Sequence, residues 1–194
     1  MEGIDISAYN RLIDWGILKS SGRADFVYIK SSEGVHTIDR MGSIHADNAK
    51  KAGVPFGYYH FCHPELYDAK TEASAFLAAL SHLPGPGLIP VMDMEYSYDK
   101  AGNKVPIGKD VASWILEFIG YMNGPVMIYT SPDYVNNELR GHKLGRYPLW
   151  LANYSNSAHL PAGWSKYQLW QYGKGAVAGI KGEVDVDRGE IIFL

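Results

Sequence analysis

The sequence has 194 residues, of which 46% are hydrophobic and 20% are charged, and its formal net charge is −3. A chain of this length and apolar content can bury one sizeable core, which argues against a disordered, collagen-like or coiled-coil protein. The small net charge provides no strong field to attract nucleic acid or an anionic membrane. We therefore expect a single domain over residues 1–194, without a nucleic-acid partner.

The cysteine content and the apolar segments restrict the protein further. Cys62 is the only cysteine, so an intramolecular disulfide and a zinc site of the Cys-x-x-Cys kind are both excluded. The first residues, MEGIDIS, lack the features of a secretory signal peptide. Apolar runs such as residues 88–92 are far shorter than the roughly 20 residues that cross a bilayer. We expect cytoplasmic synthesis, no membrane insertion and a monomer.

Apolar segments rich in Val, Ile, Tyr and Phe alternate with segments of helical periodicity, which is typical of a parallel sheet with helical crossovers. The predicted strands lie near residues 3–6, 26–30, 56–61, 88–94, 126–130, 149–152, 167–172 and 183–186. The predicted helices lie near residues 12–19, 44–52, 69–82, 109–122 and 132–139. Five strand–helix units followed by three strands predict an α/β fold, a TIM-like barrel with a degenerate last third.

The active site of such a barrel lies at the carboxyl ends of its parallel strands. Asp93 and Glu95 follow the apolar run LIPVM, two residues apart, so their side chains leave an extended strand on the same face. Two carboxyl groups that close raise each other's proton affinity, so one can act as a general acid while the other stays ionised. Glycoside hydrolysis needs this division of labour. The alternative interpretation is a pair of solvated loop carboxylates.

Further strand-end residues are acidic or aromatic. Asp5 and Asp185 lie on the first and last predicted strands, which pair in a closed barrel, although either residue alone fits a capping or turn role. Tyr59, Tyr129 and Trp170 offer aromatic faces that suit stacking against sugar rings, with ordinary barrel packing as the alternative. Four carboxylates and several aromatic rings are therefore expected around one cleft.

Metal and cofactor motifs are weak. His60 and His63 lie near Cys62, but this spacing does not make a convincing metal site, and structural or substrate-contact roles are favoured. The glycine-rich phosphate-loop patterns are missing. We expect no metal and no cofactor.

Eight motifs in order resemble the glycoside hydrolase family 25 lysozymes, the muramidases of phage endolysins, bacteria and fungi. The motifs are GIDIS at 3–7, FVYIKSSEG at 26–34, AGVPFGYYHF at 52–61, PVMDMEYS at 90–97, IYTSPDY at 128–134, LWLANYS at 149–155, QLWQYG at 168–173 and VDVD at 184–187. The resemblance implies a flattened (β/α)5β3 barrel. It also implies hydrolysis of the β-1,4 bond between N-acetylmuramic acid and N-acetylglucosamine in bacterial peptidoglycan.

Carried over by motif, Glu95 would be the general acid and Asp93 its partner carboxylate. Asp5 and Asp185 match the family's other two cleft acids, and Tyr59 matches a tyrosine that contacts the substrate's acetamido group. Tyr129 and Trp170 fall where the family lines its groove. For the mechanism we prefer a substrate-assisted route, in which the acetamido oxygen of the sugar attacks, over a direct two-carboxylate scheme.

Two other functions compete with this interpretation. A chitinase-like hydrolase also ends a barrel strand with D-x-E, but the longer acidic signature upstream of that pair is missing here. A catalytically silent sugar-binding or phage structural module would keep the barrel, although all four acids are present. We expect no separate cell-wall-binding domain, and a phage endolysin released through a holin-type pore or another export route is the preferred context.

Overall fold

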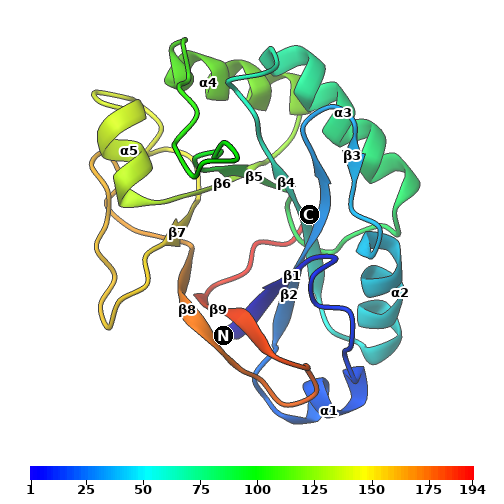
Figure 1. The fold of residues 1–194 in the computed structure, drawn as a ribbon. Coiled ribbons are helices and arrows are strands. Elements are labelled where there is room, and N and C mark those ends of the chain that lie inside the picture. The colour runs from blue at the N-terminus through cyan, green and yellow to red at the C-terminus, as the bar shows by residue number, and fades with distance from the viewer.

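The strands form one sheet that closes on itself in the computed structural model, which describes residues 1–194 (Figure 1). They are β1 (Glu2–Ile6), β2 (Phe26–Glu33), β3 (Thr37–Ile38), β4 (Phe56–Phe61), β5 (Val91–Met94), β6 (Met127–Thr130), β7 (Leu149–Ala152), β8 (Leu169–Ala176) and β9 (Glu183–Gly189). The sheet order is β1-β9-β8-β7-β6-β5-β4-β2, and pairing of β1 with β2 closes an eight-stranded barrel. The short β3, which was not predicted, pairs with β2 outside this ring.

The barrel strands run parallel to one another, with one exception. All barrel pairs are parallel except those of β9, which runs antiparallel to both β1 and β8. The eight predicted strands are therefore confirmed.

The chain has five helices. They lie outside the barrel (Figure 1). They are α1 (Trp15–Ser20), α2 (Gly42–Ala52), α3 (Ala69–His82), α4 (Val111–Met122) and α5 (Pro132–Glu138). One helix follows each of the first five barrel strands, and none follows β7 or β8. This order confirms the predicted arrangement of five strand–helix units and three further strands.

Local sequence signals fix where the helices begin. The Asp110 side chain accepts hydrogen bonds from the backbone N–H groups of Ala112 and Ser113 at the start of α4. Ser131 caps α5 in the same way, with Pro132 at the first helical position. Such caps stabilise a helix by about 1 kcal/mol each, because they satisfy N–H groups that have no partner within the helix. They set the residues at which α4 and α5 begin.

The barrel interior is apolar toward the amino ends of the parallel strands. Its buried members are Phe26, Tyr28, Leu88, Ile89, Val91, Met127, Trp150 and Leu169. A Cβ atom at Gly3 would overlap the Phe26 ring, and one at Gly57 would overlap the Tyr28 ring, so these two glycines make room for the aromatic filling. A second and larger core lies between the sheet and the helices.

The C-terminal segment lies against the amino ends of the parallel strands. Ile191 and Ile192 pack on the interior cluster, and the backbone N–H of Ile89 donates to the carbonyl of Ile192 at 3.0 Å. Leu88 forms a β-bridge with Phe193. The buried apolar cluster and the C-terminal segment close the barrel at the amino ends of the parallel strands. A cleft therefore has to open at their carboxyl ends.

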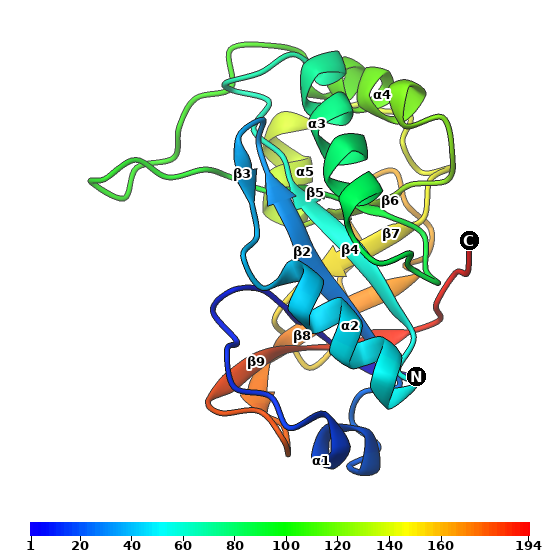
Figure 2. The same ribbon diagram turned by 90° about the vertical axis from the view of Figure 1, so that its right-hand side faces the viewer.

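The connection between β5 and α4 projects from the body as an arm (Figure 2). Tyr98 and Lys104 form a bridge within it. The Lys104 ammonium lies 2.7 Å from Asp133 of α5 and 3.7 Å from the centre of the Tyr96 ring. Because the arm begins at the carboxyl end of β5, it stands beside the open end of the barrel. None of the helices combines the length and the apolar character needed to cross a membrane.

Candidate active site

A cleft with a volume of about 330 Å³ opens at the carboxyl ends of the parallel strands. Its acidic lining residues are Asp5, Asp93, Glu95 and Asp185. The prediction that these four carboxyl groups share one cleft is confirmed as geometry.

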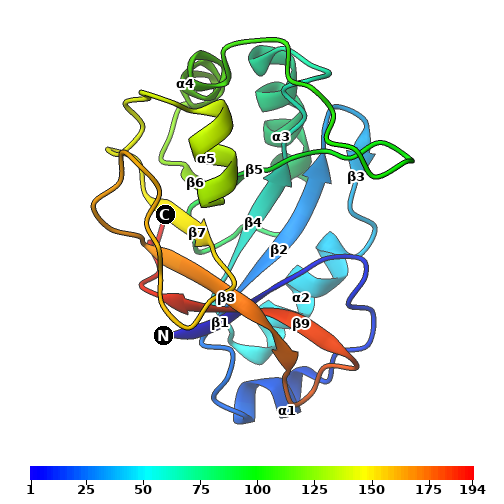
Figure 3. The same cartoon turned by 60° about the vertical axis from the view of Figure 1, so that its left-hand side comes forward.

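Strand pairing explains how residues distant in sequence meet here. Strands β1 and β9 lie side by side (Figure 3). Asp5 of β1 is the direct partner of Asp185 of β9, as expected from closure of the barrel. Asp93 of β5 is the partner of Phe61 on one side and of Tyr129 on the other. The two acid pairs therefore lie on different parts of the barrel rim and face a common space.

The pair Asp93 and Glu95 sits largely out of water. Asp93 is 5% exposed, and its Oδ1 atom has no hydrogen-bond partner in the protein. Burial, and next the neighbouring Glu95 charge, raise the pKa of Asp93 well above its usual range. Burial also raises the pKa of Glu95, and the Lys30 ammonium opposes this rise. The pair therefore holds a proton at a pH where an exposed carboxyl group would have lost it.

Lys30 is held in the cleft by a chain of charged groups. Its ammonium lies 2.5 Å from Glu33, whose other oxygen lies 3.1 Å from Nε2 of His63. Nδ1 of His63 lies 2.7 Å from Glu65. Burial alone would lower the pKa of His63, but its hydrogen bonds to Glu33 and Glu65 outweigh burial and raise the pKa to about 9. The hydrogen bond from His63, helped by Lys30, lowers the pKa of Glu33 to about 2.

Asp5 is held by neutral groups. Gln171 donates from Nε2 to Asp5 Oδ2 at 2.7 Å, while the hydroxyl of Tyr129 donates to Gln171 Oε1 at 2.9 Å. Burial, and then the charge of Asp185, raise the pKa of Asp5 to about 8. Gln171 thus fixes the orientation of Asp5 without adding a positive charge.

Asp185 is the more open member of its pair. The hydroxyl of Tyr154 donates to Asp185 Oδ1 at 2.5 Å, and the Lys174 ammonium lies 3.8 Å from the same oxygen. Tyr154 comes from the loop after β7, so this bond ties that loop to the rim of the cleft.

Two of the three predicted aromatic residues line the cleft. Tyr59 and Tyr129 lie there, and their ring centres are 6.4 and 5.0 Å from that of Trp150, which also lines the cleft. Trp170 lies elsewhere. It precedes Gln171 on β8, and because successive side chains of a strand point to opposite faces, it lies outside the barrel. There it lines a second hollow that shares Tyr154 with the cleft.

Some cleft residues were not among the predicted site residues. Phe61 lines the cleft, and its spacing of two from Tyr59 on β4 was a signal that could have found it. Lys30 and Gln171 lie at the ends of predicted strands, but their parts in fixing the acids depend on three-dimensional contacts. Tyr9, which is 94% exposed at the rim, left no signal in the sequence.

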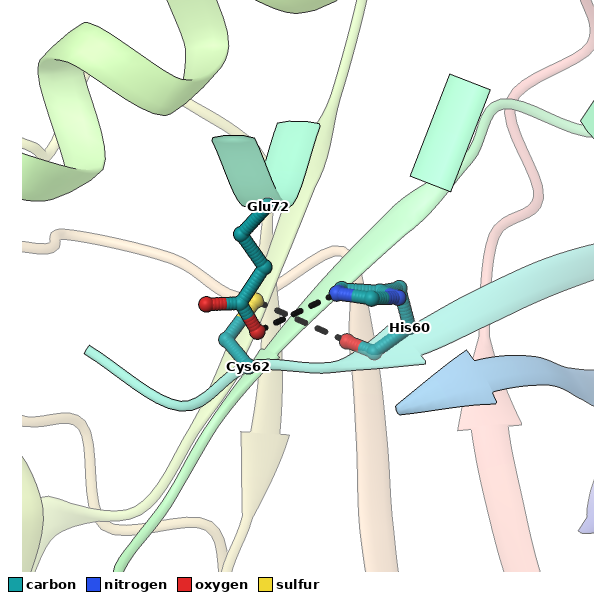
Figure 4. A group of neighbouring side chains, drawn as sticks. All are labelled: His60, Cys62 and Glu72. Atoms are coloured by element: carbon teal, nitrogen blue, oxygen red, sulfur yellow. Dashed lines mark hydrogen bonds and ion pairs between the residues drawn. The ribbon is translucent and has the colours of Figure 1, made fainter. Parts of the chain in front are cut away.

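A separate polar cluster lies between β4 and α3 (Figure 4). His60, Cys62 and Glu72 are fully buried, and their potential ligand atoms lie within 4.8 Å of one another. Nδ1 of His60 lies 2.8 Å from the Ser32 hydroxyl, and Nε2 lies 3.3 Å from Glu72 Oε1, which also accepts from the backbone N–H of His63 at 2.7 Å. These bonds join β2, β4 and α3, which fits the structural one of the two roles predicted for His60, the other being substrate contact.

Comparison with known proteins identifies a family and relatives of this chain. Residues 4–180 match the sequence profile described as glycosyl hydrolases family 25. The chain is 30% identical to lysozyme M1 of Streptomyces globisporus over 95% of its own length and 66% of that protein. It is also 30% identical to the N,O-diacetylmuramidase of Arthroderma benhamiae, over 88% of this chain and 76% of that protein.

Among solved structures, the bacterial lysozyme from Streptomyces coelicolor superposes with a TM-score of 0.85 at 28% identity, covering 97% of this chain and 91% of the other. The chain thus spans about two thirds of lysozyme M1 but nearly the whole of the superposed structure. Sequence profile, relatives and barrel agree, and the chain belongs to the glycosyl hydrolases family 25.

Proposed function

We propose that this protein hydrolyses bacterial peptidoglycan by cleaving the β-1,4 bond between N-acetylmuramic acid and N-acetylglucosamine. The observation that carries the proposal is the cleft in which Asp93 and Glu95 share buried surroundings opposite Asp5 and Asp185. Membership of a glycosyl hydrolase family and similarity to a lysozyme and a muramidase support it. The phage context stays a prediction.

Glu95 is the proposed general acid. It is partly exposed to the cleft, whereas Asp93 is buried, so Glu95 is the member of the pair that a glycosidic oxygen can reach. The raised pKa of Glu95 keeps the carboxyl protonated at a higher pH than in water. General acid catalysis by a placed side chain contributes about 10²- to 10⁴-fold to a rate.

Asp93 is the proposed partner carboxylate in a substrate-assisted route. In the first step the acetamido oxygen of the sugar bonds to the anomeric carbon as the glycosidic bond breaks, and Glu95 gives its proton to the leaving oxygen. Asp93 accepts the hydrogen bond of the acetamido N–H and balances the positive charge of the ring that forms. Water then attacks the anomeric carbon, its proton passes to Glu95, and the acetamido group is restored.

The remaining residues suit the recognition of a sugar. Tyr59 and Tyr129 present ring surfaces beside polar groups, and Trp150 packs edge-to-face against both rings. An apolar sugar face can pack on such rings while its hydroxyl groups reach the carboxylates and Lys30. Tyr59 is proposed to contact the acetamido group of the substrate.

Digestion of purified peptidoglycan tests the proposal. The parent protein and the Glu95→Gln variant are compared, and the new sugar ends are reduced and identified by mass spectrometry. New muramic acid ends with the parent protein, lost in the variant, are expected. New glucosamine ends would point to a glucosaminidase, and wall binding without new ends would favour a silent module.

The stereochemical route has its own test. The substrate-assisted route retains the anomeric configuration, so NMR spectra taken in the first minutes of digestion should show the β-anomer of the new reducing end. An initial α-anomer would rule this route out.

A further inference from the structure

β9 carries a second acid, Asp187, which is not part of the cleft lining. Its exposed fraction is 0%, whereas Asp185, two residues earlier, lines the cleft. The two side chains leave β9 on the same face, because residues two apart on a strand share a face. Asp187 therefore lies in the barrel interior, one level below the rim acids.

The groups around Asp187 supply no positive charge. Trp150 donates from Nε1 to Asp187 Oδ1 at 2.8 Å, whereas Oδ2 is buried without a hydrogen-bond partner. On β8 its strand partner is the neutral Gln171, and on β1 its partner is Gly3, which has no side chain. The nearby basic residue Arg188 is on the outer face, where its guanidinium stacks 3.9 Å from the centre of the Tyr172 ring.

Asp5 is the neighbouring group that can accept a hydrogen bond from Asp187. Asp5 pairs with Asp185, so Asp187 is its diagonal neighbour on the same face of the β1–β9 pair, with only Gly3 opposite Asp187. Two charged carboxylates at this depth would repel each other and leave Oδ2 unsatisfied, whereas a protonated Asp187 has a hydrogen to donate.

We propose that Asp187 is a neutral carboxylic acid that donates a hydrogen bond from Oδ2 to Asp5, and that it is a positioning residue for the cleft. Asp5 then accepts from two neutral donors, Gln171 and Asp187, which hold its carboxyl group opposite Asp185. Trp150 fixes the other oxygen of Asp187, so the acid cannot turn away from Asp5. Burial, and next the neighbouring Asp5, raise the pKa of Asp187 well above its usual range, which agrees with the neutral form.

The titratable groups that face Asp187 make its proton sensitive to alkaline conditions. They are Asp5 on β1, Asp185 on β9, Tyr28 on β2 and Tyr154 from the loop after β7. Each of them is neutral or negative, so loss of the Asp187 proton would place an uncompensated charge beside Asp5. The site should therefore lose its geometry on the alkaline side, where Asp187 ionises.

The stability test compares the parent with Asp187→Asn by thermal and urea unfolding from pH 4 to pH 9. An unfolded aspartate loses its proton near pH 3.9, whereas folded Asp187 keeps it, so folding becomes harder as pH rises above about 4. Asparagine can donate to Asp5 and accept from Trp150 without a proton to lose. The stability gain of Asp187→Asn should therefore grow with pH, by at most tenfold in the unfolding constant per pH unit.

Asp47→Asn is the matched control, because Asp47 is an exposed aspartate of α2. Its pH dependence of unfolding should follow that of the parent. A gain for Asp187→Asn that is flat or shrinks as pH rises would overturn the proposal. Failure of Asp187→Asn to fold would also overturn it, since asparagine offers the same two hydrogen bonds.

The activity test rests on the proposed function. Asp187→Leu, which keeps a branched side chain but no donor, should lose at least tenfold in kcat/KM on peptidoglycan, and Asp187→Asn should recover this loss and extend activity to higher pH. Equal activity of the two variants, or no alkaline extension, would contradict a positioning role. If the parent protein itself cleaves no peptidoglycan, the proposed function fails, while the unfolding experiment still decides the state of Asp187.

Discussion

The two acid pairs of the cleft are held in different ways. Asp93 and Glu95 lie on one strand beside the Lys30 ammonium, which Glu33 holds in place. Asp5 and Asp185 lie across two antiparallel strands, and their closest hydrogen-bond donors are the neutral side chains of Gln171 and Tyr154. A cation opposes the effect of burial through its charge, whereas a neutral donor orients a carboxyl group and lowers its pKa only through the hydrogen bond. The first pair is therefore suited to proton transfer and the second to positioning.

The largest effect should separate the two pairs. Glu95→Gln removes the proposed general acid and should reduce kcat by about 10²- to 10⁴-fold. Asp185→Asn keeps the shape of a positioning group and should reduce kcat less. Release of reducing ends from peptidoglycan measures both variants, with thermal unfolding as the control for folding. A greater loss for Asp185→Asn would reverse the roles given to the two pairs.

The next effect concerns the cation. Lys30→Met removes the charge that lowers the pKa values of Asp93 and Glu95, so both should rise and the pH–activity profile should move to higher pH. The matched comparison is Lys174→Met, because the Lys174 ammonium lies 3.8 Å from Asp185. This variant should move the profile less. Initial rates between pH 4 and pH 9 measure the shift. A profile that stays in place or moves to lower pH in Lys30→Met would contradict the role of this cation.

A smaller effect is expected from the neutral donors. Tyr154→Phe removes the hydroxyl that donates to Asp185 Oδ1 and should lower kcat/KM about tenfold, since a hydrogen bond to a charged group is worth roughly 1.5–3 kcal/mol before exposure weakens it. The pH–activity profile should keep its position. If Tyr154→Phe shifted the profile as far as Lys30→Met does, the distinction between cation and neutral donor would fail.

The smallest effect is one on stability. His63 has a raised pKa of about 9 in the folded chain, so its contribution is complete below about pH 6.5 and is lost as pH rises through about 9. His63→Gln should lower the free energy of unfolding by about 1 kcal/mol at pH 6, since His63 and its partner Glu33 are partly exposed. The difference from the parent should shrink toward pH 10, as followed by urea unfolding. A difference independent of pH would mean that His63 is not charged in the fold.

The sequence could predict both acid pairs, for different reasons. The spacing of Asp93 and Glu95 on one strand is a local pattern, and the structure places both in the cleft. The meeting of Asp5 with Asp185 follows from closure of the barrel, which the order of predicted elements indicates. Local spacing and chain topology can both be read without coordinates.

The support of the acids could not be predicted in this way. Lys30 and Glu33 are three residues apart and would point to opposite faces of a regular strand, but the pairing of β2 with β4 shifts between Lys30 and Ser32 and brings both charges together. The location of Trp170 depends on which of two neighbouring residues of β8 faces the barrel interior. Gln171 faces inward, and Trp170 faces outward. An irregularity in pairing and the choice of face are both set by tertiary packing.

The central claim is that the Asp93–Glu95 pair keeps one proton at neutral pH, which general acid catalysis requires. Titration of the side-chain carboxyl carbons of Asp and Glu by NMR from pH 3 to pH 10 tests it most directly. Asp5 should titrate near pH 8, and the Asp93–Glu95 pair should lose its shared proton well above the usual range of a carboxyl group. Titration of all the cleft carboxyl groups near pH 4, together with the exposed ones, would contradict the account.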